Sequence, residues 1–217
     1  MNSPAAPHLD FSFPRNWNAE ILPARPAILP AHHFTYPREA EEIERGALEV
    51  LVRPRAALAD FSSDAPGPAP GTRESSQASL PRISTPPFLA TCALGFRDPA
   101  APTGLWSTPH PDWLCAVSGG YAYLIDTTLP ERFEMLSYRP VLEVRAAIAD
   151  NLLLFIGHQR ILAWGSNRQI WESEKLSDEG LTVADIEPGI LRGRGWEMQT
   201  DKERPFALDL HTGQRIS

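Results

Sequence analysis

Histidines are the first residues to test for chemistry, because imidazole serves both as a metal ligand and in proton transfer. They are spread along the chain, and none has the i, i+4 spacing to another histidine, or the spacing to a cysteine, that favours zinc. His158 follows a glycine at a predicted turn, so we expect an exposed turn residue rather than a general base. We expect neither a metal site nor a cofactor. The histidines are His8, His32, His33, His110, His158 and His211.

Two glycine-containing motifs resemble catalytic or phosphate-binding loops, and both lack the necessary context. Ser118-Gly119-Gly120 is not the Gly-x-Ser-x-Gly of a nucleophile elbow, and no strand–turn–helix pattern surrounds it. Gly193-Arg-Gly195 lacks the third glycine and the following helix of a phosphate-binding loop. We interpret the first motif as a turn, and we assign no catalytic residue.

Arginine and tryptophan together provide a candidate interaction surface. Arg192 and Arg194 alternate with glycines, which predicts that both project from one face of a strand. They would form surface salt bridges or bind an acidic partner. Trp and Arg are enriched among the residues that dominate protein interfaces, so we add Trp17 and Trp196 to the surface. The alternative for the tryptophans is packing between sheets.

Two functional hypotheses follow. The first is a non-catalytic protein-interaction or scaffold protein, with a protein partner or self-association; a flat apolar patch rimmed by arginine would favour it. The second is an enzyme or small-ligand-binding protein with a polar funnel at one end of the sheets. Asp126, Arg160, Asp185 and Asp209 are its conceivable contributors, and a pocket of convergent titratable groups would favour it.

Composition limits the class of protein. The chain has 217 residues and a formal net charge of −7, without a basic run, so it lacks the electrostatic footprint of a nucleic-acid-binding protein. No signal-like segment and no run of 18 apolar residues occurs, which predicts a cytoplasmic protein without a membrane partner. Cys92 and Cys115 each lie in an apolar, strand-like run, where a reduced cysteine acts as a small hydrophobe.

The first half of the chain divides into five predicted segments. Residues 1–36 form a proline-rich N-terminal arm, whose large apolar side chains pack on its own domain or on another protein. Pro37 and the acidic residues after it predict a short helix over 37–45. Strands follow at 47–53 and 88–96 and pair as neighbours. Between them, Pro, Gly and Ser predict a flexible loop over 62–87. The apolar residues of the arm are Phe11, Phe13, Trp17, Ile21 and Leu22.

Similar segments recur at intervals of 38 residues in the second half. Gly119, Gly157 and Gly195 are equally spaced, and an apolar strand-like segment precedes each. We expect a positive φ at Gly157. Further strands surround each of these segments, so a period near 40 indicates β-meander units. The other predicted strands are 105–107, 121–126, 133–136, 141–148, 161–164, 170–171, 181–186, 206–210 and 215–216.

One turn carries a resemblance to a known family. In Asp209-Leu-His-Thr-Gly213 the aspartate can accept hydrogen bonds from later backbone N–H groups, and Gly213 can adopt a left-handed conformation. An apolar strand, Asp-x-x-Thr-Gly and a further strand resemble the blade turn of quinoprotein-type β-propeller repeats. Ile170-Trp171 is similar to the strand after that turn. The resemblance covers about residues 105–217 and implies blade-like architecture, without quinone binding.

The predicted fold is therefore all-β, with a single domain over 37–217. It contains three to four antiparallel β-meander units in a small or partial β-propeller-like arrangement, together with the short N-terminal helix and the arm. Three units of 38 residues are too few for a usual propeller of about four to eight blades. A four-blade ring, an open half-propeller and a sandwich of the same meanders all fit this pattern.

Overall fold

The computed structural model describes residues 6–38, 46–55, 85–96 and 101–216. Within these ranges the chain forms sixteen β-strands in four separate sheets and a single 3-10 turn at Ile148–Asp150, which confirms the all-β prediction. None of the helical structure in these ranges has the length and apolar character needed to cross a membrane. Apart from residues 37, 38 and 85–87, the predicted helix and the predicted flexible loop lie outside the described residues.

Sheet 1 has four strands and is crossed by a long connection. Its antiparallel central pair confirms that the segments at 47–53 and 88–96 are neighbours. β2 and β3 lie at opposite edges, so residues 22–32 must cross the sheet between them. Glu49 points away from the other sheets yet is buried, and it lines a pocket with Leu22 and Arg25 of this crossover. The crossover therefore covers the middle of the outer face, while Glu20 and Arg53 at its edge remain exposed. In order, the strands are β2 (Trp17–Ile21), β4 (Ala47–Pro54), β5 (Phe88–Ala93) and β3 (His33–Tyr36).

Much of the described proline-rich segment is built into the sheets as strands, while residues 22–32 lie over sheet 1. Besides β2 and β3, the segment supplies β1 (His8–Asp10). This strand pairs in parallel with β6 (Gly104–Ser107) and so belongs to sheet 2. Phe13 and Trp17 are buried, as expected if the segment packs on its own domain. Prolines separate these short strands, which explains why no strand periodicity was visible in the sequence.

Sheets 2, 3 and 4 are each formed mainly by strands that are consecutive in sequence and antiparallel. All the strands predicted after residue 104 are present except the last, where Leu208 and Arg215 form an isolated bridge. Sheet 2 contains β1, β6 (Gly104–Ser107), β7 (Trp113–Ser118), β8 (Tyr121–Asp126) and β9 (Phe133–Met135). Sheet 3 contains β10 (Glu143–Ala147), β11 (Leu152–Ile156), β12 (Ile161–Trp164) and β13 (Gln169–Glu172). Sheet 4 contains β14 (Leu181–Glu187), β15 (Ile190–Glu197) and β16 (Lys202–Asp209).

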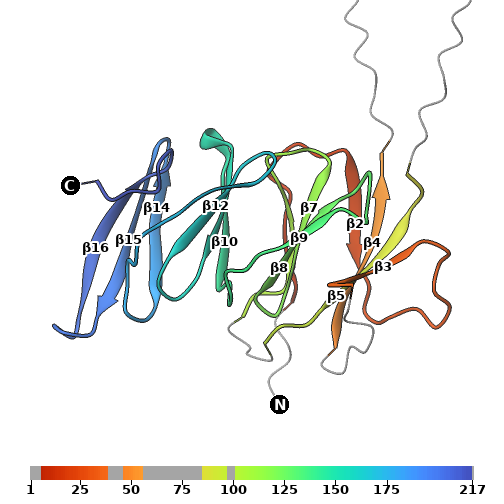
Figure 1. Ribbon diagram of the computed structural model, residues 1–217, viewed down its shortest axis with the longest axis horizontal. Coiled ribbons are helices and arrows are strands. Elements are labelled where there is room, and N and C mark those ends of the chain that lie inside the picture. The colour runs from red at the N-terminus through yellow and green to blue at the C-terminus, as the bar shows by residue number, and fades with distance from the viewer. Residues whose placement is uncertain (1–5, 39–45, 56–84, 97–100, 217) are drawn as a thin grey trace, which may run out of the picture.

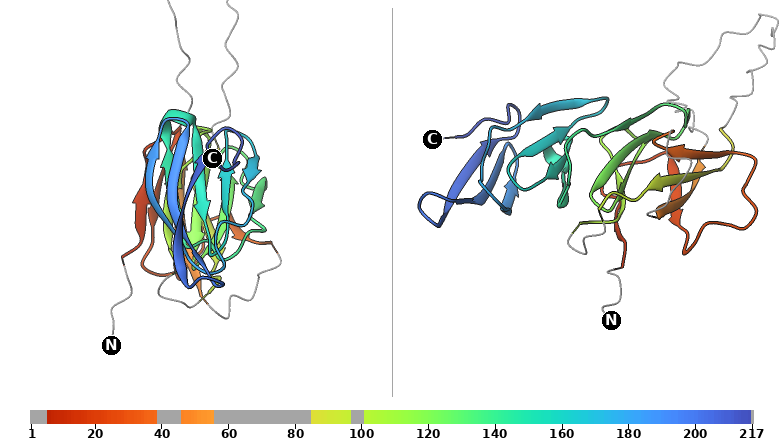
Figure 2. Two further views of the ribbon diagram at one scale, coloured as in Figure 1. Left: turned by 90° about the vertical axis from the view of Figure 1, so that its left-hand side faces the viewer. Right: turned by 60° about the horizontal axis from the view of Figure 1, so that its bottom comes forward.

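The four sheets stack face to face in an open row, with a hydrophobic core between each neighbouring pair (Figure 1). Trp17 and Tyr123 belong to the core between sheets 1 and 2, and Trp113 and Trp164 to the core between sheets 2 and 3. Trp171 belongs to the core between sheets 3 and 4. Viewed along the row, the sheets overlap one another (Figure 2). Sheets 1 and 4 lie at opposite ends, so the described strands do not close into a ring.

Gly119, Gly157 and Gly195 lie at or just after β7, β11 and β15. At each of them, the segment that leads into the sheet from the preceding sheet passes close to the glycine. A Cβ at Gly119 would lie 2.5 Å from the Phe96 carbonyl oxygen, and one at Gly157 would lie 2.5 Å from Cε1 of Tyr138. At Gly195 a Cβ would meet the backbone of Leu176. The positive φ expected at Gly157 is wrong, although Gly119 has a φ of +56°. Close approach of another segment is therefore the property that the three glycines share.

Candidate functional site

The structure separates the four residues of the candidate interaction surface. Trp17 lies on β2 with no exposed surface, in the core between sheets 1 and 2, so including it in a surface was wrong. Its amphipathic ring fills the space between sheets, which was the alternative for the tryptophans. Arg192, Arg194 and Trp196 lie together on β15, at the opposite end of the row.

Sheet 4 presents one face to sheet 3 and the other to solvent. Leu191 and Leu208 pack in the core against sheet 3. Because side chains alternate along a strand, Arg192 and Arg194 project from the opposite face, and both are exposed as predicted. Trp196 follows in the same alternation and is half-buried. We call this outer surface the terminal face; it is formed by Ala184, Arg192, Arg194, Pro205, Ala207 and Ile216.

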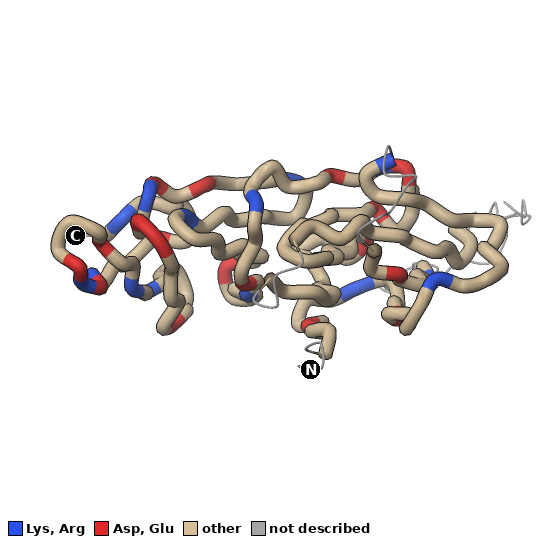
Figure 3. Tube along the Cα trace, turned by 90° about the horizontal axis from the view of Figure 1, so that it is seen from below, with Lys and Arg blue, Asp and Glu red and all other residues tan. Residues whose placement is uncertain are grey.

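The arginines of the terminal face form exposed ion pairs across the strands. Arg192 lies 2.7 Å from Glu187 and 3.4 Å from Asp185, and these carboxylates raise the pKa of its guanidinium, Glu187 most strongly. Arg194 lies 3.6 Å from Glu203, and its side chain is 65% exposed. Basic and acidic positions alternate at this end of the molecule (Figure 3). Exposed pairs of this kind contribute only about 0–1 kcal/mol each, so they exchange readily for other partners.

An apolar groove of about 430 Å³ runs beside these arginines. Its surface includes Pro205, Ala207 and the side chain of Ile216, which is 43% exposed. Ile216 is held there because its N–H donates to the Ala207 carbonyl at 2.9 Å. The terminal face therefore combines apolar surface with guanidinium groups, the combination expected for a protein-binding surface.

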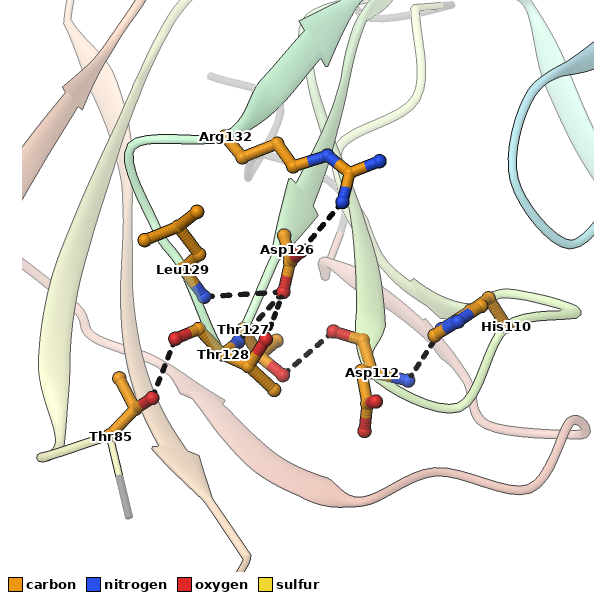
Figure 4. A network of polar contacts seen from close by, with 8 residues as sticks. All are labelled: Thr85, His110, Asp112, Asp126, Thr127, Thr128, Leu129 and Arg132. Carbon is orange, nitrogen blue, oxygen red and sulfur yellow. Dashed lines mark hydrogen bonds and ion pairs between the residues drawn. The ribbon is translucent and has the colours of Figure 1, made fainter. Parts of the chain in front are cut away.

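The polar residues around the β8–β9 turn hold the turn in place (Figure 4). Asp126 accepts hydrogen bonds from the N–H and hydroxyl of Thr128 at 2.9 and 2.7 Å, and from the N–H of Leu129 at 3.2 Å. Arg132 lies 3.7 Å from its other oxygen. The Asp112 carbonyl accepts from Thr127. Asp126 thus organises the backbone of the turn, a structural role for the first member of the expected polar funnel.

Asp209 has the same role at the end of β16. Its Oδ1 accepts hydrogen bonds from the N–H groups of His211 at 2.7 Å and Thr212 at 3.0 Å. These bonds, that of Thr212 first, lower the pKa of the carboxyl. Gly213 has φ +71° and donates to the Asp209 carbonyl, as the sequence predicted for this turn.

The expected polar funnel is not assembled. Asp126 and Asp209 are the last residues of β8 and β16. Arg160 instead precedes β12, and Asp185 lies within β14, where it pairs with Arg192 of the terminal face. No group of three histidine, cysteine, aspartate or glutamate side chains with metal-binding geometry occurs in the described ranges. Ser118-Gly119-Gly120 leads into the β7–β8 turn, as predicted, and His158 is an exposed turn residue.

The buried ionisable groups also lack the features of a reactive centre. Cys92 and Cys115 lie in different core clusters, and burial raises the pKa of both thiols, so they stay protonated and unreactive. Glu49 accepts a hydrogen bond of 2.6 Å from the Thr91 hydroxyl beneath the crossover of sheet 1.

Comparison with known proteins gives no relative: no family model matches, and neither curated proteins nor solved structures provide a match to the chain.

Proposed function

We propose that this chain is a non-catalytic protein-interaction module that binds its partner through the terminal face. The observation that carries the proposal is that apolar surface and exposed arginines share the outer face of sheet 4, and no other described element covers that face. The middle of the outer face of sheet 1, by contrast, lies beneath residues 22–32. The four sheets are blade-like units of a partial, open propeller, and the protein is cytoplasmic and uses no cofactor.

The partner segment that fits this face carries carboxylates beside an apolar side chain. Arg194 has a single acidic neighbour, Glu203, at 3.6 Å, and is more exposed than that neighbour. A partner carboxylate can therefore replace Glu203 beside Arg194 at low energetic cost. A bidentate pair between the Arg194 guanidinium and that carboxylate would be stronger than the 3.6 Å pair with Glu203. The apolar side chain would occupy the groove beside Ala207 and Ile216. Nucleic acid does not fit this chemistry, because the flanking carboxylates would repel phosphate.

Selection from a displayed peptide library tests the proposal. The full chain serves as bait, and Arg194→Glu serves for counter-selection. Enriched peptides should combine carboxylates with an apolar residue and should bind Arg194→Glu at least about tenfold more weakly. Arg168→Glu is the matched control, since Arg168 is an exposed arginine in the turn between β12 and β13. It should bind like the wild type.

Two results would overturn the proposal. One is the absence of enrichment, or the enrichment of peptides that bind Arg194→Glu as well as the wild type. The other is a dimer in sedimentation velocity that Arg194→Glu dissociates, because a second copy would then occupy the terminal face.

A further inference from the structure

A second surface pocket lies away from the terminal face, where the connection into sheet 3 meets the β11–β12 turn. Its volume is about 320 Å³. Tyr138, Arg139 and Pro140 of the connection form one side, and residues 158–160 of the turn form the other. Glu172 of β13 completes it. Only Arg160 of these residues was considered a site residue from the sequence.

The backbone beneath the pocket is held rigidly. The Tyr138 hydroxyl donates to the Arg160 carbonyl at 2.8 Å and accepts from the Arg160 N–H at 3.1 Å. Burial raises the pKa of this hydroxyl, so it stays protonated and keeps both bonds. The Tyr138 ring reaches this position because Gly157 has no side chain to block it. The turn that presents His158 and Arg160 is therefore fixed before any ligand arrives.

Positive charge exceeds negative charge in the pocket. Two arginines line the pocket, with Glu172 as the single carboxylate among its described residues. Arg139 lies over the Tyr121 ring at 5.0 Å from its centroid, and no carboxylate of the described ranges lies within ion-pair distance of it. Arg160 and Glu172 are 3.6 Å apart, with side chains 44% and 38% exposed, so their mutual attraction is weak. On a chain of net charge −7, this local excess of positive charge stands out.

We propose that this pocket binds the phosphate group of a small phosphate ester, with Arg139, His158 and Arg160 as ligands. Guanidinium groups match the spacing of phosphate oxygens and donate two hydrogen bonds at once. A third donor from His158 suits a dianion with three oxygens better than a carboxylate with two. The inference is independent of the proposed function of the terminal face.

Titration of the full chain with phenyl phosphate and with benzoate, followed by two-dimensional ¹H–¹⁵N NMR, tests the proposal. The two probes share a ring and differ in the anionic group. Phenyl phosphate should shift the backbone signals of residues 138–140 and 157–160 with a dissociation constant in the millimolar range or below. Benzoate should bind more weakly. Equal binding of the two probes would overturn the phosphate assignment.

Substitutions separate specific binding from general charge effects. Arg139→Gln and Arg160→Gln should each weaken phenyl phosphate binding about tenfold, the equivalent of one charge-assisted hydrogen bond. Arg168→Gln, outside the pocket, should leave it unchanged. Glu172→Gln should tighten binding, because it removes the only carboxylate among the described residues of the pocket and the ion-pair partner of Arg160. A purely structural role for these residues predicts no such gain. Undiminished binding in both arginine variants, or no saturable shift with the wild type, would overturn the proposal.

Discussion

At the scale of single residues, aspartates and glycines of this chain shape the backbone rather than perform chemistry. Asp209 could be assigned its turn from the sequence, because Thr212 and Gly213 complete a recognisable motif. Asp126 makes the same kind of bonds without that motif, so its turn could not be predicted, and both aspartates were also considered for the polar funnel. Trp17 was wrongly assigned to an interaction surface, because the sequence shows that a tryptophan is present but does not show whether another sheet covers it. Tyr138 and Arg139 carried no local signal, since their pocket arises only when a connection crosses a distant turn.

Gly157→Ala tests the close approach at this glycine. The added Cβ would lie 2.5 Å from Cε1 of Tyr138 and force the ring away, which should cost about 1–3 kcal/mol, as overpacking does. Urea denaturation of Gly157→Ala measures the loss. In the double variant with Tyr138→Ala the two losses should be less than additive, because the obstructing ring is gone. Simple additivity would show that the ring is not the obstacle.

The Asp209 carboxyl makes stability depend on pH. Its pKa is lowered in the folded state by the N–H groups of Thr212 and His211. Its contribution is therefore present above the unfolded pKa of about 3.9 and is lost as the pH falls through the lower folded value. Asn keeps the accepting oxygen without the charge. At pH 7 the melting temperature of the wild type should be higher than that of Asp209→Asn. The difference between the two melting temperatures should vanish in strong acid. A difference that is constant with pH would contradict this assignment.

At the scale of elements, strand positions in the second half were predictable because apolar runs and turn residues alternate there at short range. The first sheet was harder to predict. Its edge strands β2 and β3 come from a proline-rich segment that has no periodicity, and β3 is parallel to β5, a pairing that depends on the crossover at 22–32. The 62–87 loop stays a prediction. Pairing between consecutive strands can be inferred from sequence, whereas pairing that depends on a long crossover cannot.

A side-chain hydrogen bond from Trp171 links sheets 3 and 4, and a matched pair of substitutions tests it. The Trp171 indole on β13 donates at 2.7 Å to the Leu210 carbonyl after β16. Trp171→Phe should cost about 1–3 kcal/mol for the unpaired buried carbonyl, in addition to lost packing. Trp164→Phe is the control, since the Trp164 indole N–H is buried with no partner in the described ranges. Equal losses in denaturation midpoint would show that the bond contributes nothing.

At the scale of the whole molecule, each sheet packs only on its neighbours, so stability is shared between adjacent units as in repeat proteins. The charged terminal face suits the end of such a row. Removing sheet 4 after residue 179 would expose the apolar side chains of Leu154, Ile156 and Ala163. The shortened chain should melt at a lower temperature and bind a hydrophobic dye. An unchanged melting temperature without dye binding would show that sheet 3 does not need its neighbour.

The pairing of β1 with β6 has a mechanical consequence. Sheet 1 is formed by residues that lie between these two strands in the sequence, so their pairing closes a loop around it. Tension applied to the two ends of the chain would pass from β1 straight into sheet 2 and on to sheets 3 and 4. Sheet 1 would carry no load until β1 slides off β6. Parallel strands pulled in this way resist by shear, with several bonds breaking together, whereas β16 can peel away one bond at a time. Sheet 1 is thereby shielded from force for as long as β1 and β6 stay paired.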